Sequence, residues 1–517
     1  MKQISQLLFL NFICFFCIGF ALGEKGYDLI HYDLNIIPDF NQQSIDLKVT
    51  IIVNNYSLED SLWFGLNQKL EYLDVKNGKN PVQYERKDNW VLIILQNPQL
   101  EIQLNFNIKG NPGICTNEQR HTIEDSSLFL LWSERFYPID FEDWATVKTT
   151  IVLPKGFLAV APGKLIKNIE KDNTIEYQFE TTEPAVCYSV FADNRWLHTE
   201  KTINNIPIHT FLHPQSQKYV DQILTSSAEI INYYSQIFCP YSFDQFCFIT
   251  LDGIYARRAF CGYVGYSPEY LKKEFTSTGH DAHESALLWW GYTLRGTGPG
   301  AFQWTEGFGD YAEFMYDEAY GKPIPPIFQH FREEYLKIPR EEDKYYYELG
   351  GAPQKYIHGK YPWLMHILRY KIGNKAFQNA LHYLFSKYLY QTFTMDEFVN
   401  TLQKGAGQPL NWWKEEWLER KGVPELTVTA EIMPVSEGYS LMLDIEQEEA
   451  VYHLPVEVEF EIDDKTIIKK IDLNEKEEQY TFQFDSRPEQ VLLDPNGWIL
   501  MKHNKIIMSR TIYNGER

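Results

Sequence analysis

The residues best suited to chemistry in this sequence are His283 and Glu284, which stand side by side just ahead of an apolar segment. In zinc hydrolases with a helical metal motif, two histidines lie one helical turn apart so that both imidazoles face one ion. A glutamate beside the first histidine acts as general base on the zinc-bound water. Leu287 occupies the position of the second histidine, and an aliphatic side chain cannot bind a metal. The pattern therefore indicates metal-assisted hydrolysis with an incomplete ligand set.

The sequence around this pair resembles the gluzincin aminopeptidases, the alanyl-aminopeptidase-like zinc metallopeptidases. Trp289-Trp290-Gly291 matches the aromatic-aromatic-glycine that follows the family motif. Glu306 lies 23 residues after His283, within Trp304-Thr305-Glu306-Gly307-Phe308. The resemblance implies that His283 is the first metal ligand, that Glu284 is the general base, and that Glu306 is the third ligand.

The resemblance extends over nearly the whole chain after residue 23. Its further segments are Gly359-Lys360 with residues 365–369, the context of Tyr137-Pro138, and Leu493-Asp494-Pro495. It implies a multidomain α+β fold. An N-terminal antiparallel β saddle or sandwich would precede a mainly helical, zincin-like (thermolysin-like) domain, and a small β-sandwich would follow.

Other positions also depart from the family pattern. His358 stands where the family has the tyrosine that stabilises the oxyanion, and Tyr356, two residues earlier, could serve in its place. The loop whose glutamate holds the substrate amine should lie near residues 259–267, which contain no carboxylate.

A replacement for the missing ligand is conceivable. His280 precedes His283 by three residues, so the two could share one face of a helix and bind zinc together with Glu306. However, His280 lies on the opposite side of His283 from Leu287, and the ion would have to shift by roughly 10 Å along the helix.

Two functional hypotheses follow. The first is an exported aminopeptidase-like protein, a pseudoenzyme with lost or altered zinc-dependent hydrolysis that binds a peptide or protein N-terminus. The second is an active zinc metallopeptidase that removes N-terminal residues with a non-standard ligand set. Both share the expected fold, and fold alone does not decide between them.

The elements that would position these residues follow from hydrophobic periodicity. Residues 24–197 alternate in segments such as 45–51 and 100–104, which predicts an N-terminal β domain. The return to alternation at 456–462 predicts a β-sandwich over 424–517. The peptidase-like domain between them, 198–423, has helical periodicity. The predicted helices lie at about 219–238, 280–293, 305–320, 323–336, 360–389, 394–405 and 411–421.

The charge balance narrows the possible partners. The chain of 517 residues is long enough for three or four domains, and 70 acidic against 48 basic residues leave a formal net charge of −22. Such a chain repels phosphates, so it is a poor candidate for binding anionic lipid, and we expect no nucleic acid partner.

The N-terminus predicts a signal peptide over residues 1–23. An apolar run from Leu7 to Leu22 follows Lys2, and the small residues Ala21 and Gly23 suit cleavage. We expect an extracytoplasmic protein, secreted or periplasmic, with no transmembrane span after cleavage. The alternative is an uncleaved N-terminal anchor.

The cysteines after the signal follow no zinc-knuckle spacing, and their number is odd. They are Cys115, Cys187, Cys239, Cys247 and Cys261. Export permits a Cys239–Cys247 disulfide, and buried free thiols are the alternative.

Several other conspicuous residues have a structural interpretation. Glu306 could pair with Arg295 instead of binding a metal. His366 lies in an apolar helical segment, which is typical of a core histidine. Trp289 and Trp290 are expected to pack in the core.

Overall fold

The structure is a computed structural model that divides into two compact units. Unit 1 contains residues up to 298 together with 385–394, and unit 2 contains 299–384 and 395–517. The described residues are 25–113, 122–252, 256–277, 280–323, 326–348, 354–504 and 506–510. The predicted signal segment 1–23 and Cys115 lie outside them.

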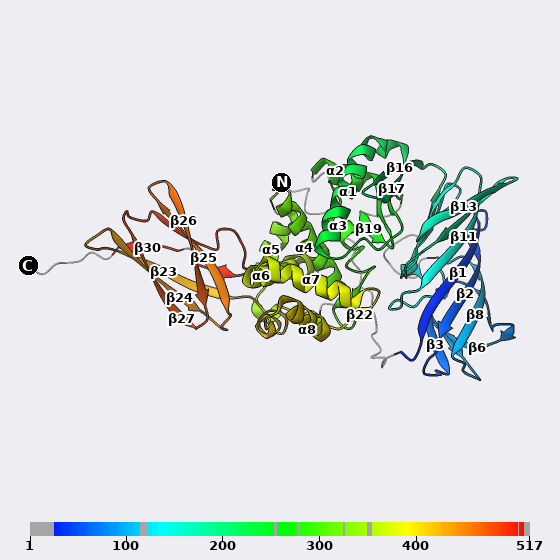
Figure 1. Cartoon of the computed structure of the whole chain (residues 1–517), viewed down its shortest axis with the longest axis horizontal. Coiled ribbons are helices and arrows are strands. Elements are labelled where there is room, and N and C mark those ends of the chain that lie inside the picture. The colour runs from blue at the N-terminus through cyan, green and yellow to red at the C-terminus, as the bar shows by residue number, and fades with distance from the viewer. Residues whose placement is uncertain are drawn as a thin grey trace, which may run out of the picture. The chain divides into compact units, whose positions relative to one another are not determined.

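The largest sheet of unit 1 has eight strands in the order β13-β14-β11-β1-β2-β8-β4-β5 (Figure 1). In β2 the side chains of Ile45, Leu47 and Val49 are all buried and alternate with more exposed residues, as the period of two predicts. The strands are β1 (Asp28–Asp39), β2 (Ser44–Asn54), β4 (Tyr72–Asn77), β5 (Asn80–Pro81), β8 (Glu101–Gly110), β11 (Thr146–Pro154), β13 (Lys164–Lys171) and β14 (Thr174–Glu180).

Two smaller sheets complete the N-terminal β region. One has the order β12-β15-β10-β9 and the other β3-β7-β6. Their strands are β3 (Ser61–Gly65), β6 (Gln83–Lys87), β7 (Trp90–Ile94), β9 (Thr122–Glu124), β10 (Ser127–Leu130), β12 (Leu158–Val160) and β15 (Val190–Asp193).

A five-stranded mixed sheet packs against helix α3, which carries His283 and Glu284. Its order is β16-β17-β18-β20-β19, with β16 and β19 at the edges. The strands are β16 (Leu197–Ile203), β17 (Ile206–Leu212), β18 (Phe246–Thr250), β19 (Arg257–Phe260) and β20 (Tyr263–Tyr266). The helices of this part are α1 (Val220–Ile237), α2 (Pro268–Ser277) and α3 (Ala282–Ala286). The short pair β21 (Arg295–Gly296) and β22 (Thr392–Phe393) also belongs to unit 1.

Helix α3 is shorter than the predicted helix at 280–293. It ends at Ala286, and the next amides bond three residues back, Leu288 to Ser285 and Trp289 to Ala286. Gly291 then adopts a φ of 133°, which only glycine takes readily. Because every residue from 282 to 294 is buried, apolar periodicity could not mark this end.

Unit 2 begins with a group of helices. Two glycines allow close helix contacts there, because a Cβ at Gly307 would lie 2.3 Å from Tyr361 and one at Gly359 would lie 2.4 Å from the Phe331 carbonyl oxygen. The helices are α4 (Ala301–Ala319), α5 (Pro326–Leu336), α6 (Gln354–Ile372), α7 (Asn374–Tyr388, which crosses the unit boundary in sequence), α8 (Met395–Ala406) and α9 (Asn411–Trp413). The predicted helix 360–389 is thus divided, at Gly373, whose φ is 84°.

Two sheets follow the helices, as the alternation after residue 424 predicts. One has the order β27-β24-β23-β29, with β30 also paired to β23, and the other β26-β25-β28. Their strands are β23 (Glu425–Pro434), β24 (Tyr439–Gln447), β25 (Leu454–Ile462), β26 (Lys465–Leu473), β27 (Glu477–Phe484), β28 (Gln490–Leu493), β29 (Lys502–His503) and β30 (Met508–Arg510).

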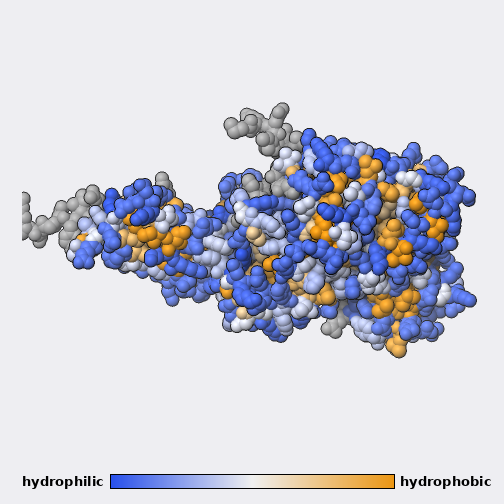
Figure 2. All heavy atoms as spheres, turned by 45° about the horizontal axis from the view of Figure 1, so that its top comes forward, coloured by the Kyte–Doolittle hydropathy of each residue, from blue (hydrophilic) through white to orange (hydrophobic). Residues whose placement is uncertain are grey.

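The surface is mostly hydrophilic, as expected for a chain rich in charged residues. Hydrophilic residues predominate on the face drawn in Figure 2, and the apolar areas there are separate from one another. Among the described helices, none combines the length and the apolar character that a bilayer crossing requires.

Candidate functional site

Helix α3 of unit 1 carries His283 and Glu284. Both side chains are buried, with 4% and 6% of their surface exposed. The amide of Leu287 donates a 3.3 Å hydrogen bond to the His283 carbonyl, so Leu287 lies one turn further on. Leu287 is buried as well. The position beside His283 that would hold a second metal-binding imidazole is therefore filled by an aliphatic side chain.

The Glu284 carboxylate forms an ion pair with Arg257 of strand β19. Arg257 Nε lies 3.1 Å from Glu284 Oε1, and Arg257 Nη1 lies 2.6 Å from Glu274 Oε1 on helix α2. One guanidinium thus binds two carboxylates in a largely buried setting. Burial alone would lower the pKa of Arg257, but the acidic groups around it raise this pKa well above its ordinary value. The Arg257 guanidinium beside Glu284 therefore keeps its positive charge at every pH at which the protein is folded.

A second acidic group lies at the start of α3. Asp281 accepts a hydrogen bond from the Tyr266 hydroxyl of β20 and one of 3.3 Å from Ser285 Oγ. Burial, and then repulsion from Glu284, raise the pKa of Asp281 well above its usual range. Both effects penalise the ionised form of the Asp281 carboxyl. His280 is also buried on this segment, and its Nδ1 accepts a 3.3 Å hydrogen bond from the Ala282 amide.

The loop expected to hold the substrate amine forms a β-hairpin. Residues 259–267 make the end of β19, a turn at Gly262 with a φ of 86°, and β20. Residues 259–266 are all buried. The hairpin offers no side-chain carboxylate, so its contribution to the site is the guanidinium of Arg257. We did not anticipate Arg257 from the sequence, where the adjacent pair Arg257-Arg258 was the only signal.

In unit 2, Glu306 belongs to a buried acidic stripe on helix α4. The stripe repeats at intervals of four, three and four residues, so its members share one helix face. They are Glu306, Asp310, Glu313 and Asp317, and each is at most 9% exposed. Only Glu306 was expected from the sequence, although the helical spacing of the other three was visible there.

The two candidates for the catalytic hydroxyl position lie on helix α6 and have separate partners. His358 Nδ1 lies 2.6 Å from Asp310 Oδ2 of α4. Tyr356 donates a 3.1 Å hydrogen bond to the Glu342 carbonyl, and burial raises the pKa of its phenol. Within unit 2, His358 therefore contacts the acidic stripe, whereas the Tyr356 hydroxyl donates its hydrogen bond to a backbone carbonyl.

The residues of unit 1 do not fit a standard zinc centre. A leucine occupies the second ligand position, and a guanidinium lies 3.1 Å from the predicted general base. A fixed positive charge beside a carboxylate disfavours a divalent cation at the same place.

The remaining sequence predictions concern the core. His366 is buried and stacked on Trp498, with ring centroids 4.3 Å apart, so it is a core histidine as predicted. Trp289 and Trp290 are also buried. Arg295 donates to the carbonyls of Gly291 and Phe141 within unit 1. The four described cysteines, Cys187, Cys239, Cys247 and Cys261, are free thiols.

Comparison with known proteins relates the chain to aminopeptidases. No family model matches it. It is 24% identical to aminopeptidase N of Lactococcus lactis subsp. lactis in an alignment 291 residues long, which covers 51% of this chain and 34% of that protein. The chain also resembles the crystal structure of Legionella pneumophila aminopeptidase A in complex with aspartic acid, with a TM-score of 0.73 and 16% identity. That likeness covers 93% of this chain and 60% of the Legionella chain.

These likenesses support a peptidase-like relationship and an aminopeptidase-like, multidomain fold of mixed sheets and helices. At 16% identity the structural likeness shows the fold alone. The chain spans about a third of the length of the Lactococcus protein and about 60% of the Legionella chain.

Proposed function

We propose that this chain is an exported, aminopeptidase-like protein of the gluzincin type in which zinc-dependent hydrolysis is lost or altered. It would retain the fold as a module that binds a peptide or protein N-terminus. The observation that carries the proposal is the Arg257–Glu284 ion pair next to Leu287.

The ion pair acts against the chemistry that Glu284 would perform. A general base must accept a proton from water as the reaction proceeds. A guanidinium at hydrogen-bonding distance stabilises the ionised carboxylate and so weakens it as a base. Arg257 also donates a 2.6 Å hydrogen bond from Nη1 to Glu274 Oε1, and this contact helps to hold the guanidinium beside Glu284.

The replacement at position 287 is compatible with folding. A buried leucine packs against its surroundings and leaves no polar group to satisfy. Loss of the ligand therefore need not cost stability, and the fold can persist without the ion. The aminopeptidase-like fold supports peptides as the ligand class.

The first experiment compares the metal content and the activity of the purified, tag-free chain with those of His283→Ala. We expect no zinc that depends on His283, measured by elemental mass spectrometry, and no release of the fluorophore from aminoacyl-coumarin substrates. About one zinc per chain that is lost in His283→Ala, together with amino acid release, would overturn the proposal.

A gain-of-ligand variant tests the reason for the loss. Leu287→His restores an imidazole one turn after His283, so we expect the zinc affinity at this position to rise. Adding Arg257→Gln removes the adjacent cation and should raise the affinity by a further factor of about ten or more.

Competition titration against a chromophoric chelator measures both steps, and Leu287→Asn is the matched polar control. Equal zinc affinity of Leu287→His and Leu287→Asn would mean that more than the missing histidine prevents binding.

The alternative is an active peptidase with His280, His283 and Glu306 as ligands. In that case His280→Ala should abolish both bound zinc and hydrolysis. Our proposal predicts that His280→Ala changes neither.

A further inference from the structure

The hairpin of strands β16 and β17 (Figure 1) carries two histidines and a glutamate, which are residue types that can bind a metal ion. Glu200 of β16 is directly opposite His209 of β17, and His198 is opposite Phe211. Because alternate residues of a strand share a face and opposed residues lie side by side, these four side chains project from one face of the hairpin.

The donor atoms on this face are close enough to share an ion. His198 Nε2 lies 3.0 Å from His209 Nδ1, and His209 Nδ1 lies 3.8 Å from Glu200 Oε2. All three donor atoms lie within 4.8 Å of one another. Zinc–nitrogen bonds of about 2.0–2.1 Å in a tetrahedron imply donor separations of roughly 3.3 Å. The observed separations lie on either side of that value, so small side-chain movements would complete the geometry.

The rings are held in place before any ion arrives. His198 stacks on Phe211, with centroids 4.5 Å apart and an angle of 13° between the rings. Phe211 in turn packs against a buried apolar cluster that includes Trp196.

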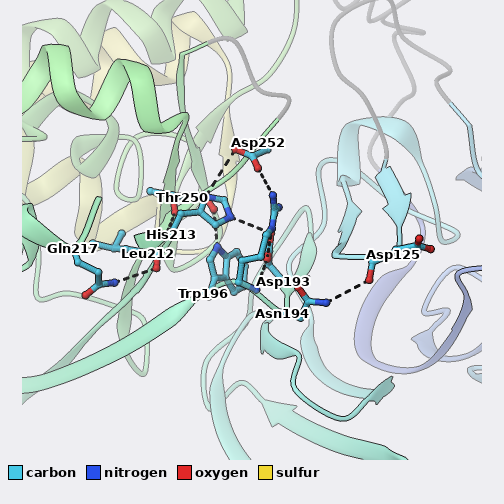
Figure 3. Close-up of polar contacts among 10 residues, drawn as sticks. Asp125, Asp193, Asn194, Trp196, Leu212, His213, Gln217, Thr250 and Asp252 are labelled. Carbon is cyan, nitrogen blue, oxygen red and sulfur yellow. Dashed lines mark hydrogen bonds and ion pairs between the residues drawn. The ribbon is translucent and has the colours of Figure 1, made fainter. Parts of the chain in front are cut away.

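The base of the hairpin is also anchored (Figure 3). Trp196, just before β16, donates from Nε1 to the Thr250 carbonyl at 2.8 Å, and the His213 amide, just after β17, donates to Thr250 Oγ1 at 2.8 Å. His213 Nε2 lies 3.1 Å from the buried carboxylate of Asp193. Such anchoring reduces the rearrangement that metal binding would require.

One side of the cluster is open to solvent. The Glu200 side chain is 52% exposed and that of His209 is 14% exposed. An ion can therefore enter without local unfolding, and a water molecule can occupy a further position.

We propose that this hairpin binds a divalent transition-metal ion of the zinc class. The ligands are His198 Nε2, His209 Nδ1 and a carboxylate oxygen of Glu200, with a fourth position open to water. Two imidazoles and one carboxylate suit Zn²⁺ and disfavour the hard cations Mg²⁺ and Ca²⁺, which prefer oxygen ligands. The site is independent of the function proposed above, and its zinc would add to any measured metal content.

The test titrates Zn²⁺ into tag-free, chelator-treated protein against a chromophoric competitor, and Co²⁺ absorption reports the coordination. We expect one ion per chain, with an affinity that falls at least about tenfold in His198→Ala and in His209→Ala. Glu200→Gln should weaken binding less, and circular dichroism should show that each variant folds. His283→Ala and the exposed-strand control His503→Ala should bind as the wild type does.

The alternative is that His198 and His209 only hydrogen-bond to each other. Zinc affinity that is unchanged in both hairpin variants, or no bound zinc in the wild type, would overturn the site. Zinc that is lost only in His283→Ala would overturn both this site and the proposed function. Zinc that is lost in the hairpin variants and kept in His283→Ala would support both.

Discussion

Single buried residues show how strongly the interior of unit 2 acts on ionisable groups. His366 is stacked on Trp498, and the Tyr311 hydroxyl lies 3.4 Å from its Nδ1. Burial lowers the pKa of His366 to about 3, and the positive charges of Arg369 and Arg332 contribute. The folded protein therefore keeps this imidazole neutral well below the pH at which a free histidine takes up a proton.

The stability of the protein should consequently depend on pH through His366. The pKa of this imidazole is about 3 in the folded protein, against 6.5 for an unperturbed histidine, so the unfolded chain binds the proton first as the pH falls. This favours unfolding and removes about 1.4 kcal/mol of stability for each pH unit between the unperturbed pKa and the folded pKa of about 3.

We expect the free energy of unfolding of His366→Phe to fall less than that of the wild type when the pH is lowered from about 7.5 to about 5.5. An unfolded histidine takes up its proton in this range. Urea unfolding measures the difference. The exposed His503→Phe should follow the wild type. Identical pH dependence in the wild type and His366→Phe would contradict the assignment.

At the scale of elements, contacts between helices position the acidic stripe of unit 2. Gly307 follows Glu306 on α4 and faces Tyr361 on α6, where an added Cβ would lie 2.3 Å from the Tyr361 Cβ. The Asp310–His358 pair joins the same two helices. A residue larger than glycine at position 307 would push these helices apart and loosen that pair.

Gly307→Ala should therefore destabilise unit 2 by about 1–3 kcal/mol, because an overpacked contact strains both helices. Helix propensity alone would make Gly307→Ala more stable by about 1 kcal/mol, because alanine is a better helix former than glycine. A loss of stability would therefore show that the close helix contact outweighs propensity. Thermal or urea unfolding measures it. A variant more stable than the wild type would show that α4 and α6 can separate without cost.

At the scale of the whole molecule, charge limits the range of partners. The formal net charge of −22 repels polyanions over the distance of a Debye length. We expect no binding of a DNA duplex in a gel-shift assay. This should hold even at a low salt concentration of about 50 mM, because low salt strengthens electrostatic binding. A histone-like basic protein is the positive control for the assay. A shift at micromolar protein would contradict this expectation.

Much of the architecture was predictable because it depends on local patterns. Strand β2 and helix α1 lie within a few residues of their predicted positions, since alternation and helical periodicity are properties of short segments. The short helix α3 was not predictable, because a segment buried on every side has no periodicity to mark its end.

The sequence by itself determined the local features of this protein. Leu287 follows His283 by one helical turn in any helix built on that segment, so its place beside His283 was predictable from spacing alone. Only the tertiary structure decided that Arg257 binds Glu284 and that His198 meets His209. The first contact depends on how a strand edge meets a helix, and the second on the register of two strands. Because many residues distant in sequence cooperate to set such geometry, no short stretch of the chain encodes it.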